Sequence, residues 1–313
     1  MEFRAWLRET RENISDDGLR GLGDSLYPVY YKGLQQVSRF QSDGTHVYDR
    51  EWDLLIVLDG CRVDAMEAVS SEYDYVSEVD SITSVNTMTL RWMEDTFCNV
   101  DRSFEDTTYV CGNPFSENVL SDAIFEELDE VWRYAWDDEI GTIRPRPLTD
   151  RTIQHMRSKS TDRVVVHYMQ PHHPFIPRPD LDRGKQADDW NNESWESVWT
   201  KLQRGDIIEE EVRDAYHRNL EVALDDIELL LNNVDADSVA ITSDHGNAFG
   251  EWNVYGHLVA CSSGVRRRST RRTRSRGPRL SRPNPRPRCS TTVRCRPTRL
   301  RGSGDRRLSL PPR

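Results

Sequence analysis

Short runs of apolar residues alternate along this chain with longer segments in which apolar residues recur every three or four positions. The short runs predict buried strands, at residues 53–58, 108–111, 163–169 and 237–242. The longer segments predict helices, at residues 2–39, 63–70, 89–97, 121–136, 148–157, 194–202 and 207–233. Strands that alternate with helices are typical of an α/β fold, so we expect a three-layer α/β/α sandwich around a mostly parallel sheet.

The distribution of charge divides the chain into an acidic part and a basic tail. Residues 1–260 carry 24 Lys+Arg against 52 Asp+Glu, a net charge of −28, whereas residues 261–313 carry 18 Arg and one acid. We therefore distinguish an N-terminal helical segment (1–50), an α/β domain (51–260) and a tail (261–313). Dense carboxylates with few lysines are how salt-adapted proteins keep a solvated surface, because concentrated salt screens its self-repulsion. The acidic part thus indicates a halophilic protein, with an ordinary acidic protein as the alternative.

The tail combines its arginines with seven prolines and contains no Trp, Tyr, Phe, Ile or Met. Such a composition cannot bury enough apolar surface to offset the loss of chain entropy, so we expect the tail to be disordered. It begins abruptly where a further strand is expected, which we interpret as the product of a shifted reading frame. The α/β domain is then truncated and its sheet has an unpaired edge. A plain disordered tail and a basic arm that binds nucleic acid are the alternatives, although we do not expect nucleic acid to be the partner.

No apolar run in the chain approaches the ~20 residues that a membrane-spanning helix needs. Residues 1–20 also lack the apolar core of a secretory signal. The six cysteines show no C-x-x-C spacing, so we expect reduced thiols rather than disulfides or a cysteine metal site. We therefore predict a cytoplasmic protein without a membrane span.

Three predicted strands end in side chains that bind metals or transfer protons. These side chains are Asp59, then His172 and His173, then Asp244 and His245. In mostly parallel sheets ligands bind beyond the carboxyl ends of the strands, so we expect these side chains to gather at one edge. Carboxylate oxygens together with imidazole nitrogens suit Zn²⁺, Mn²⁺ or a similar divalent ion.

Three short sequences at these strand ends resemble the alkaline phosphatase and sulfatase superfamily. They are LDG at 58–60, PHHP at 171–174 and SDHG at 243–246. The resemblance extends over roughly residues 50–260, and it is more specifically to the sulfatase-like proteins of halophilic archaea. It implies an α/β/α sandwich whose members cleave or transfer phosphate or sulfate esters through a covalent intermediate on a metal-bound nucleophile.

The resemblance also implies a set of metal ligands. Asp59, Asp244 and His245 are similar to the ligands of one metal ion. His257, in the sequence YGH, is the candidate for a further ligand, although a site with a single metal ion is the preferred interpretation. We expect the ion to be Mn²⁺, Zn²⁺, Mg²⁺ or Ca²⁺.

Other residues are candidates to bind the substrate. By the resemblance, His172 contacts the transferred group, and His173 beside it is a second candidate. Arg62 lies close to Asp59 in the sequence, and a guanidinium can pair with phosphate through two hydrogen bonds. A salt bridge from Arg62 to Asp64 is an alternative of equal weight.

The nucleophile is expected between the first aspartate and the second strand, at a helix N-terminus where free N–H groups and the helix dipole favour an anion. Thr89, in the sequence TLRW, resembles the start of the corresponding helix in the family, and Thr87 is the second candidate. A metal ion lowers the pKa of a hydroxyl and makes it nucleophilic. The alternative is that both threonines only cap the helix.

True sulfatases use a cysteine or serine in a C/S-x-P-x-R motif, which is converted to formylglycine. Residues 51–260 contain no such motif, and Cys61 is followed by Arg-Val-Asp. We therefore expect no formylglycine and a preference for phosphate esters over sulfate esters.

The sequence thus predicts a metal-dependent hydrolase or transferase that acts on small-molecule or glycan phosphate esters, and less readily on sulfate esters, through a threonine nucleophile. One alternative is a non-catalytic or inactive relative of the same fold. The other is a protein that binds nucleic acid through its basic tail.

Overall fold

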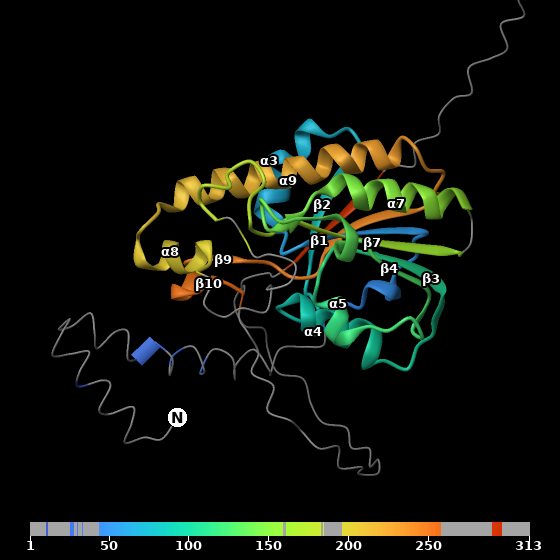
Figure 1. The fold of residues 1–313 in the computed structure, drawn as a ribbon, viewed down its shortest axis with the longest axis horizontal. Helices are drawn as coiled ribbons and strands as arrows, with labels where there is room; N and C mark the ends of the chain where they lie inside the picture. Colours follow the sequence, from blue (N-terminus) through green and yellow to red (C-terminus); the bar gives the residue numbers. More distant parts are fainter. Residues whose placement is uncertain are drawn as a thin grey trace, which may run out of the picture.

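The structure is a computed structural model, shown in Figure 1. It describes residues 44–158, 161–182, 184, 196–257 and 290–295, together with Arg11, Leu26, Tyr27, Tyr30 and Gly33. The predicted N-terminal helical segment and most of the tail lie outside the described residues. Within the described part, none of the helices has the length and apolar character that crossing a bilayer requires.

Within the described residues, seven strands form one sheet in the order β2-β11-β8-β1-β7-β3-β4 (Figure 1). The strands are β1 (Leu54–Asp59), β2 (Val76–Ile82), β3 (Phe104–Cys111), β4 (Phe125–Glu130), β7 (Arg163–Pro171), β8 (Val239–Ser243) and β11 (Ser290–Cys295). The five strands from β8 to β4 run parallel, whereas β11 is antiparallel to both of its neighbours. The predicted α/β sandwich with a mostly parallel sheet is confirmed.

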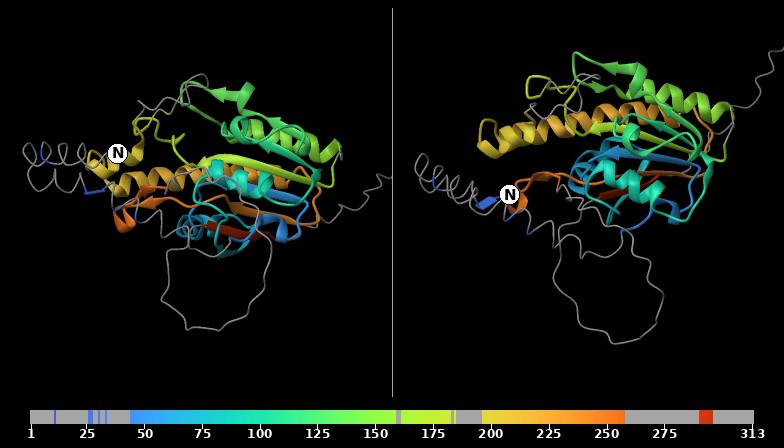
Figure 2. Two further views of the ribbon diagram at one scale, coloured as in Figure 1. Left: turned by 90° about the horizontal axis from the view of Figure 1, so that it is seen from below. Right: turned by 60° about the horizontal axis from the view of Figure 1, so that its bottom comes forward.

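Helices cover both faces of the sheet, as the two views of Figure 2 show. In the described part of the chain they are α3 (Val63–Val69), α4 (Thr89–Met93), α5 (Ser116–Val119), α6 (Trp132–Ala135), α7 (Pro145–Ser158), α8 (Val198–Arg204) and α9 (Glu209–Leu231). Helices α3, α7 and α9 pack on one face, and α4 and α5 lie on the other. Two short hairpins pair β5 (Trp136–Asp137) with β6 (Thr142–Ile143), and β9 (Ala248–Phe249) with β10 (Tyr255–Gly256).

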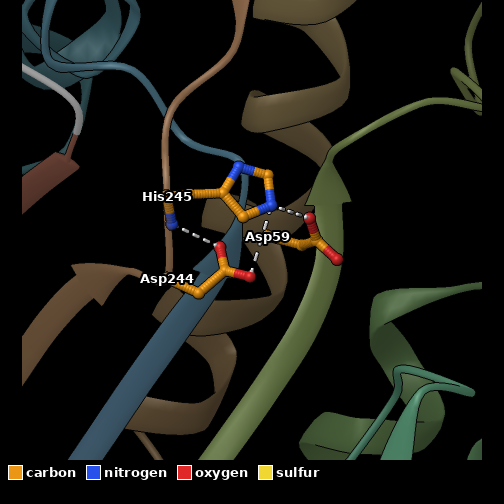
Figure 3. A group of neighbouring side chains, drawn as sticks. All are labelled: Asp59, Asp244 and His245. Atoms are coloured by element: carbon orange, nitrogen blue, oxygen red, sulfur yellow. Dashed lines mark hydrogen bonds and ion pairs between the residues drawn. The ribbon is translucent and has the colours of Figure 1, made fainter. Parts of the chain in front are cut away.

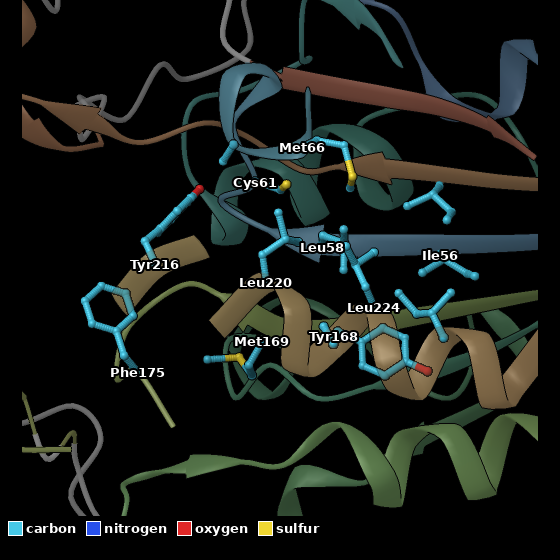
Figure 4. Close-up of a cluster of buried hydrophobic side chains, with 14 of the residues drawn as sticks. Ile56, Leu58, Cys61, Met66, Tyr168, Met169, Phe175, Tyr216, Leu220 and Leu224 are labelled. Carbon is cyan, nitrogen blue, oxygen red and sulfur yellow. The ribbon is translucent and has the colours of Figure 1, made fainter. Parts of the chain in front are cut away.

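The side chains of β1 alternate between two hydrophobic cores, one on each face of the sheet. Ile56 and Leu58 belong to the same core as Leu220 of α9, which Figure 4 shows. Leu55 and Val57 belong to the core that α4 covers. A strand that is covered on both faces needs apolar residues at every position, which explains the continuous apolar run in the sequence.

The prediction of a helix over residues 121–136 is wrong. Residues Phe125–Glu130 form strand β4, which pairs with β3, and only Trp132–Ala135 are helical. The apolar residues of this segment recur every three or four positions, as in a helix. A short strand followed by a single helical turn can show the same spacing. Pairing with β3 therefore overrides the helical pattern.

Six residues of the tail form β11, which lies between β2 and β8. Thr292 pairs with Thr242 of β8 and with Asp80 of β2. The sequence STTVRC contains three β-branched residues, which favour a strand even in an arginine-rich segment. In these six residues the structure therefore differs from the predicted disorder of the tail, while the shifted reading frame stays a prediction.

Strand β4 is tied to helix α7 by a polar cluster around Asp129, whose side chain is 8% exposed. The carboxylate accepts hydrogen bonds from Arg151 Nε at 2.6 Å and from Tyr134 OH at 2.7 Å, and it lies 3.0 Å from His155 Nε2. Burial by itself raises the pKa of Asp129, but these partners together lower it to about 2.

Replacing Asp129 by Asn is expected to reduce the free energy of unfolding by about 2 kcal/mol at pH 7, since the folded state holds this pKa below its unfolded value. A lowered carboxyl pKa contributes stability above the unfolded pKa of 3.8, and that contribution is lost as the pH falls towards about 2. Urea unfolding of wild type and variant across this range measures the difference. The control Asp180→Asn, which removes an exposed pair with Arg178, should change stability little. Equal losses in the two variants at pH 7 would contradict the role of Asp129.

Candidate metal centre and active site

Two neighbouring parallel strands place two carboxylates side by side. Asp59 is the last residue of β1, and Asp244 directly follows Ser243, which pairs with Leu58. His245 comes next, so three side chains converge at the carboxyl edge of the sheet (Figure 3). One ligand atom from each lies within 4.8 Å of the other two. The structure thus brings together the three residues that the sequence predicts as ligands of one metal ion.

The facing atoms of this triad suit a cation. His245 Nε2 lies 3.6 Å from Asp59 Oδ1 and 3.6 Å from Asp244 Oδ2. Both oxygens are buried and have no hydrogen-bond partner among the described residues. Buried carboxylate oxygens are normally paired, so two that converge on one imidazole nitrogen without a partner indicate a place for a divalent cation.

The other oxygen of each carboxylate is held by hydrogen bonds. Asn113 Nδ2 donates to Asp59 Oδ2 at 2.6 Å. Asp244 Oδ1 accepts from the backbone N–H groups of Gly60 and His245, at 2.9 and 2.8 Å. These bonds orient the carboxylates so that their remaining oxygens face His245, which is what outer partners do at metal centres.

The two carboxylates influence each other's protonation. Burial, together with the charge of Asp244, raises the pKa of Asp59 well above its usual range. Burial also acts to raise the pKa of Asp244, but the imidazoles of His245 and His167 lower it. Two adjacent carboxylates in a buried place resist being charged together unless a positive charge compensates them. A divalent cation supplies that charge, so the residues present fit one.

Gly60 stands at a position where a side chain does not fit. Its φ of +67° lies in the left-handed region, and a Cβ there would meet Asn247 Nδ2 at 2.5 Å. Because the N–H of Gly60 also holds Asp244 Oδ1, a side chain at this position would disturb the orientation of Asp244 in the triad.

Thr89 is the first residue of helix α4, and its hydroxyl reaches the triad of Asp59, Asp244 and His245. Oγ1 lies 3.1 Å from His245 Nε2 and 3.4 Å from Asp59 Oδ2, and the residue is only 4% exposed. The N-cap position belongs to Met88, so the Thr89 hydroxyl is engaged by the triad rather than by a capping bond. Thr87 lies before the helix begins. The structure thus places the Thr89 hydroxyl against the triad, and a nucleophilic role for either threonine stays a prediction.

A second group of imidazoles lies beside the triad. His172 stacks on His173 with ring centroids 4.3 Å apart, and the ring of His257 lies 6.2 Å from that of His172. The rings of His257 and His245 are 5.2 Å apart. Burial and the neighbouring imidazoles lower the pKa of His172 well below its usual range and that of His257 to about 3. All of the histidines predicted for the site thus lie at one edge of the sheet.

His173 is fixed by its surroundings. Its Nδ1 lies 2.7 Å from Asp182 Oδ2, and its ring meets the edge of Trp199 at 5.9 Å between centroids. The ring is 6% exposed and stacks on His172, so it supports its neighbour. A role for His173 in binding substrate stays a prediction.

Arg62 is engaged by acidic side chains. Its guanidinium lies 2.6 Å from Asp64 and 2.9 Å from Glu251, and it donates to the carbonyl of Asn247 at 2.6 Å. The salt bridge to Asp64 is the alternative that the sequence allows. A role for Arg62 in binding an anionic substrate stays a prediction.

Two residues of the site are not predicted from the sequence. Asn113 follows β3 in the sequence Gly-Asn-Pro, so the rule that identifies Asp59 at a strand end applies to it as well. His167 lies inside β7 and is fully buried, with Nε2 3.8 Å from Asp244 Oδ2 and Nδ1 2.8 Å from Tyr109 OH. No sequence pattern distinguishes it from its apolar neighbours in the strand.

No protein-family model matches the chain, and no curated protein matches its sequence. Solved structures do match. One is the soluble domain of lipooligosaccharide phosphoethanolamine transferase A from Neisseria meningitidis, with 12% identity over 66% of this chain and 70% of that chain and a TM-score of 0.45. A second is the integral membrane protein of the same name, with 13% identity over 82% of this chain and 55% of that chain and a TM-score of 0.48.

A third similar structure is a protein in the alkaline phosphatase superfamily from Vibrio parahaemolyticus. It has 10% identity over 69% of this chain and 57% of that chain, with a TM-score of 0.36. The chain thus spans little more than half the length of the second and third structures. Similarities at this level assign no family to the chain, and the likeness to the sulfatase-like proteins of halophilic archaea stays a prediction.

Asp59→Asn is expected to remove the response of the protein to metal and to stabilise the metal-free protein. Asn relieves the repulsion between two buried carboxylates, an effect of about 1–3 kcal/mol. Thermal unfolding after chelation, and again with Mn²⁺ or Zn²⁺, measures both effects. Asp180→Asn, at an exposed site, should behave as wild type. A variant that is less stable than wild type without metal, or equally stabilised by metal, would count against the site.

Gly60→Ala is expected to weaken metal binding about 10-fold, because the new Cβ displaces groups that orient Asp244. Gly205→Ala is the matched control, since Gly205 also has a positive φ, +78°, but has nothing within 4 Å of its added Cβ. Calorimetric titration with metal measures the affinities. Thermal unfolding measures the loss of stability that both variants share, because each places an alanine at a positive φ. If the two variants bind metal equally well, the close contact at Gly60 has no bearing on the site.

Proposed function

We propose that this chain is a divalent-metal-dependent hydrolase or transferase of phosphate esters, of the alkaline phosphatase type, with Thr89 as its nucleophile. The observation that carries the proposal is the place of the Thr89 hydroxyl. It lies 3.1 Å from His245 Nε2, the atom on which the two unpartnered carboxylate oxygens converge. A hydroxyl beside a metal-binding triad is what ester transfer through a covalent intermediate requires.

In this proposal Asp59, Asp244 and His245 hold the cation. When bound, the cation acts as a Lewis acid that lowers the pKa of a hydroxyl and offsets charge on phosphoryl oxygens. Asn113 and the N–H of Gly60 keep the two carboxylates oriented. Two oxygen ligands and one nitrogen ligand favour Mn²⁺ or Zn²⁺ over Mg²⁺ and Ca²⁺, which prefer oxygen ligands alone.

The covalent step begins at Thr89. Its Oγ1 attacks the phosphorus, a bond from Oγ1 to phosphorus forms, and the bond from phosphorus to the ester oxygen breaks. The hydroxyl proton moves towards Asp59 Oδ2, to which Oγ1 already donates at 3.4 Å. The ester oxygen takes up a proton from His172, or from water if His172 only binds the transferred group, and the alcohol leaves. Water in a hydrolase, or a second alcohol in a transferase, then attacks the phosphothreonine and restores the Thr89 hydroxyl.

His172 is proposed to bind the transferred group or to protonate the leaving oxygen. Its Nδ1 lies 2.6 Å from the carbonyl oxygen of His173, which places one proton on Nδ1 and leaves Nε2 as the atom for a second. Burial lowers the pKa of His172 in the substrate-free protein. A phosphate anion beside the ring raises the pKa of an imidazole, so His172 would take up its second proton as substrate binds.

Phosphate esters of small molecules or glycans are the proposed substrates, and sulfate esters are less favoured. The hydroxyl beside the proposed metal ligands belongs to Thr89, not to a cysteine or serine of a C/S-x-P-x-R motif. The chain does contain two such sequences, at 295–299 and 309–313. Both follow SDHG, whereas the family's nucleophile precedes it, so no formylglycine role is proposed for them.

Thr89→Val is expected to lower turnover about 10³-fold or more, because it removes the nucleophile, while metal affinity changes little. Thr89→Ser keeps a hydroxyl and should retain part of the activity. Rates with nitrophenyl phosphate, bis-nitrophenyl phosphate and nitrophenyl sulfate, in high salt with Mn²⁺ or Zn²⁺, measure the effect. Thr87→Val is the matched control and should behave as wild type.

Three outcomes would change the proposal. Full activity of Thr89→Val would exclude this residue as the nucleophile. Turnover of the sulfate ester alone would replace phosphate by sulfate chemistry. A wild type that binds metal but turns over none of the three esters would favour a non-catalytic relative of the fold.

A further inference from the structure

Helix α9 carries three polar side chains that lie three residues apart. Each of them reaches a different loop of the site. They are Arg213, Tyr216 and Asn219. Residues three apart lie on one side of a helix, so a single rigid element contacts the segments that follow β8, β1 and β7. Tyr216 is 1% exposed and Asn219 0% exposed, which is unusual for polar side chains on the apolar face of a helix.

Asn219 binds the loop that carries the site histidines. Its Nδ2 donates to the carbonyl oxygens of Pro171, at 3.2 Å, and His172, at 3.0 Å. Its Oδ1 accepts from the N–H of Ile176 at 3.0 Å. One buried side chain thus satisfies three backbone groups of this loop, which would otherwise be buried without partners.

Tyr216 binds the loop after β1 in the same way. Its hydroxyl donates to the carbonyl of Gly60 and accepts from the N–H of Arg62 at 3.1 Å. The N–H of Gly60 is the group that holds Asp244 Oδ1. Tyr216, which Figure 4 shows reaching from α9 towards this loop, is therefore one residue removed from a predicted metal ligand.

Arg213 contacts the segment after β8. Its guanidinium lies over the ring of Phe249, 4.5 Å from the centroid, and 3.9 Å from Glu251. These contacts are more exposed than those of the other two residues, so we expect them to contribute less.

We infer that α9 is the positioning element of the site, and that its residues act on two different parts of it. Tyr216 sets the orientation of the metal ligands through Gly60, and Asn219 sets the position of His172. This inference rests on the proposed function for its catalytic part, because His172 acts on substrate only if the site transfers a phosphoryl group. Both residues are positioning residues, since neither touches the predicted metal or substrate.

The two roles predict that one variant of the full chain changes metal affinity and that another changes the rate of turnover. Tyr216→Phe should raise the dissociation constant for Mn²⁺ or Zn²⁺ about 10-fold, because the Gly60 loop loses its anchor. Asn219→Leu should leave that constant within about twofold and lower kcat for bis-nitrophenyl phosphate about 10-fold or more. Calorimetric titration and steady-state rates measure the two effects.

Two further variants separate positioning from general loss of packing. Tyr75→Phe removes a tyrosine hydroxyl that binds the carbonyl of Leu224, five residues beyond Asn219 on the same helix, and should change neither quantity. Asn219→Ala leaves room for water to bind the freed carbonyls, so it should fold even if Asn219→Leu does not, and it should still lower kcat.

Histidine-ring NMR spectra give a readout that is independent of activity. Asn219 variants should shift the ring signals of His172 and leave those of His245 in place, and Tyr216→Phe should do the reverse. If both variants change both sets of signals, or neither set, the inference is overturned. A wild type without turnover would refute the proposed function alone, because the metal titrations and ring signals would still decide the inference.

Discussion

The repulsion between Asp59 and Asp244, buried side by side at the ends of β1 and β8, is the constraint on which the surrounding structure depends. Each carboxylate keeps one oxygen bound, to Asn113 or to the N–H of Gly60, and turns the other towards His245. The two remaining oxygens therefore both face one nitrogen atom, where a single cation would compensate the charge of both carboxylates. The segments after β1, β3 and β8 each supply a partner to this pair, so their conformations are linked through it.

The framework of the site follows from two properties of the sequence. A strand that is buried on both faces is apolar throughout, as residues 54–58 are, and the carboxyl ends of parallel strands share one edge of the sheet. These two properties are sufficient to predict that Asp59, Asp244 and His245 lie together. They also place His172 at the same edge, because it follows the predicted strand that becomes β7.

Other features of the site depend on contacts that the sequence does not reveal. His167 occupies the interior of a strand, where an imidazole resembles any buried residue until Asp244 is seen beside it. Asn219 is a polar residue on an apolar helix face, which is a signal in itself, but its partners lie about 45 residues earlier in the chain. Strand β4 is hard to predict for a related reason, since only its pairing with β3 distinguishes it from a helix.

The hydrogen bond from Gly60 to Asp244 joins residues that are 184 positions apart. A cation held by Asp59 and Asp244 would therefore connect distant parts of the chain, much as a disulfide between them would. Closing a loop of that length in an unfolded chain reduces its entropy by the equivalent of roughly 5 kcal/mol. The paired strands β1 and β8 have already closed this loop in the folded protein, so the ligands meet the cation as a rigid, preassembled set. A short peptide that carried the same three side chains would lack this advantage and would bind the same ion more weakly.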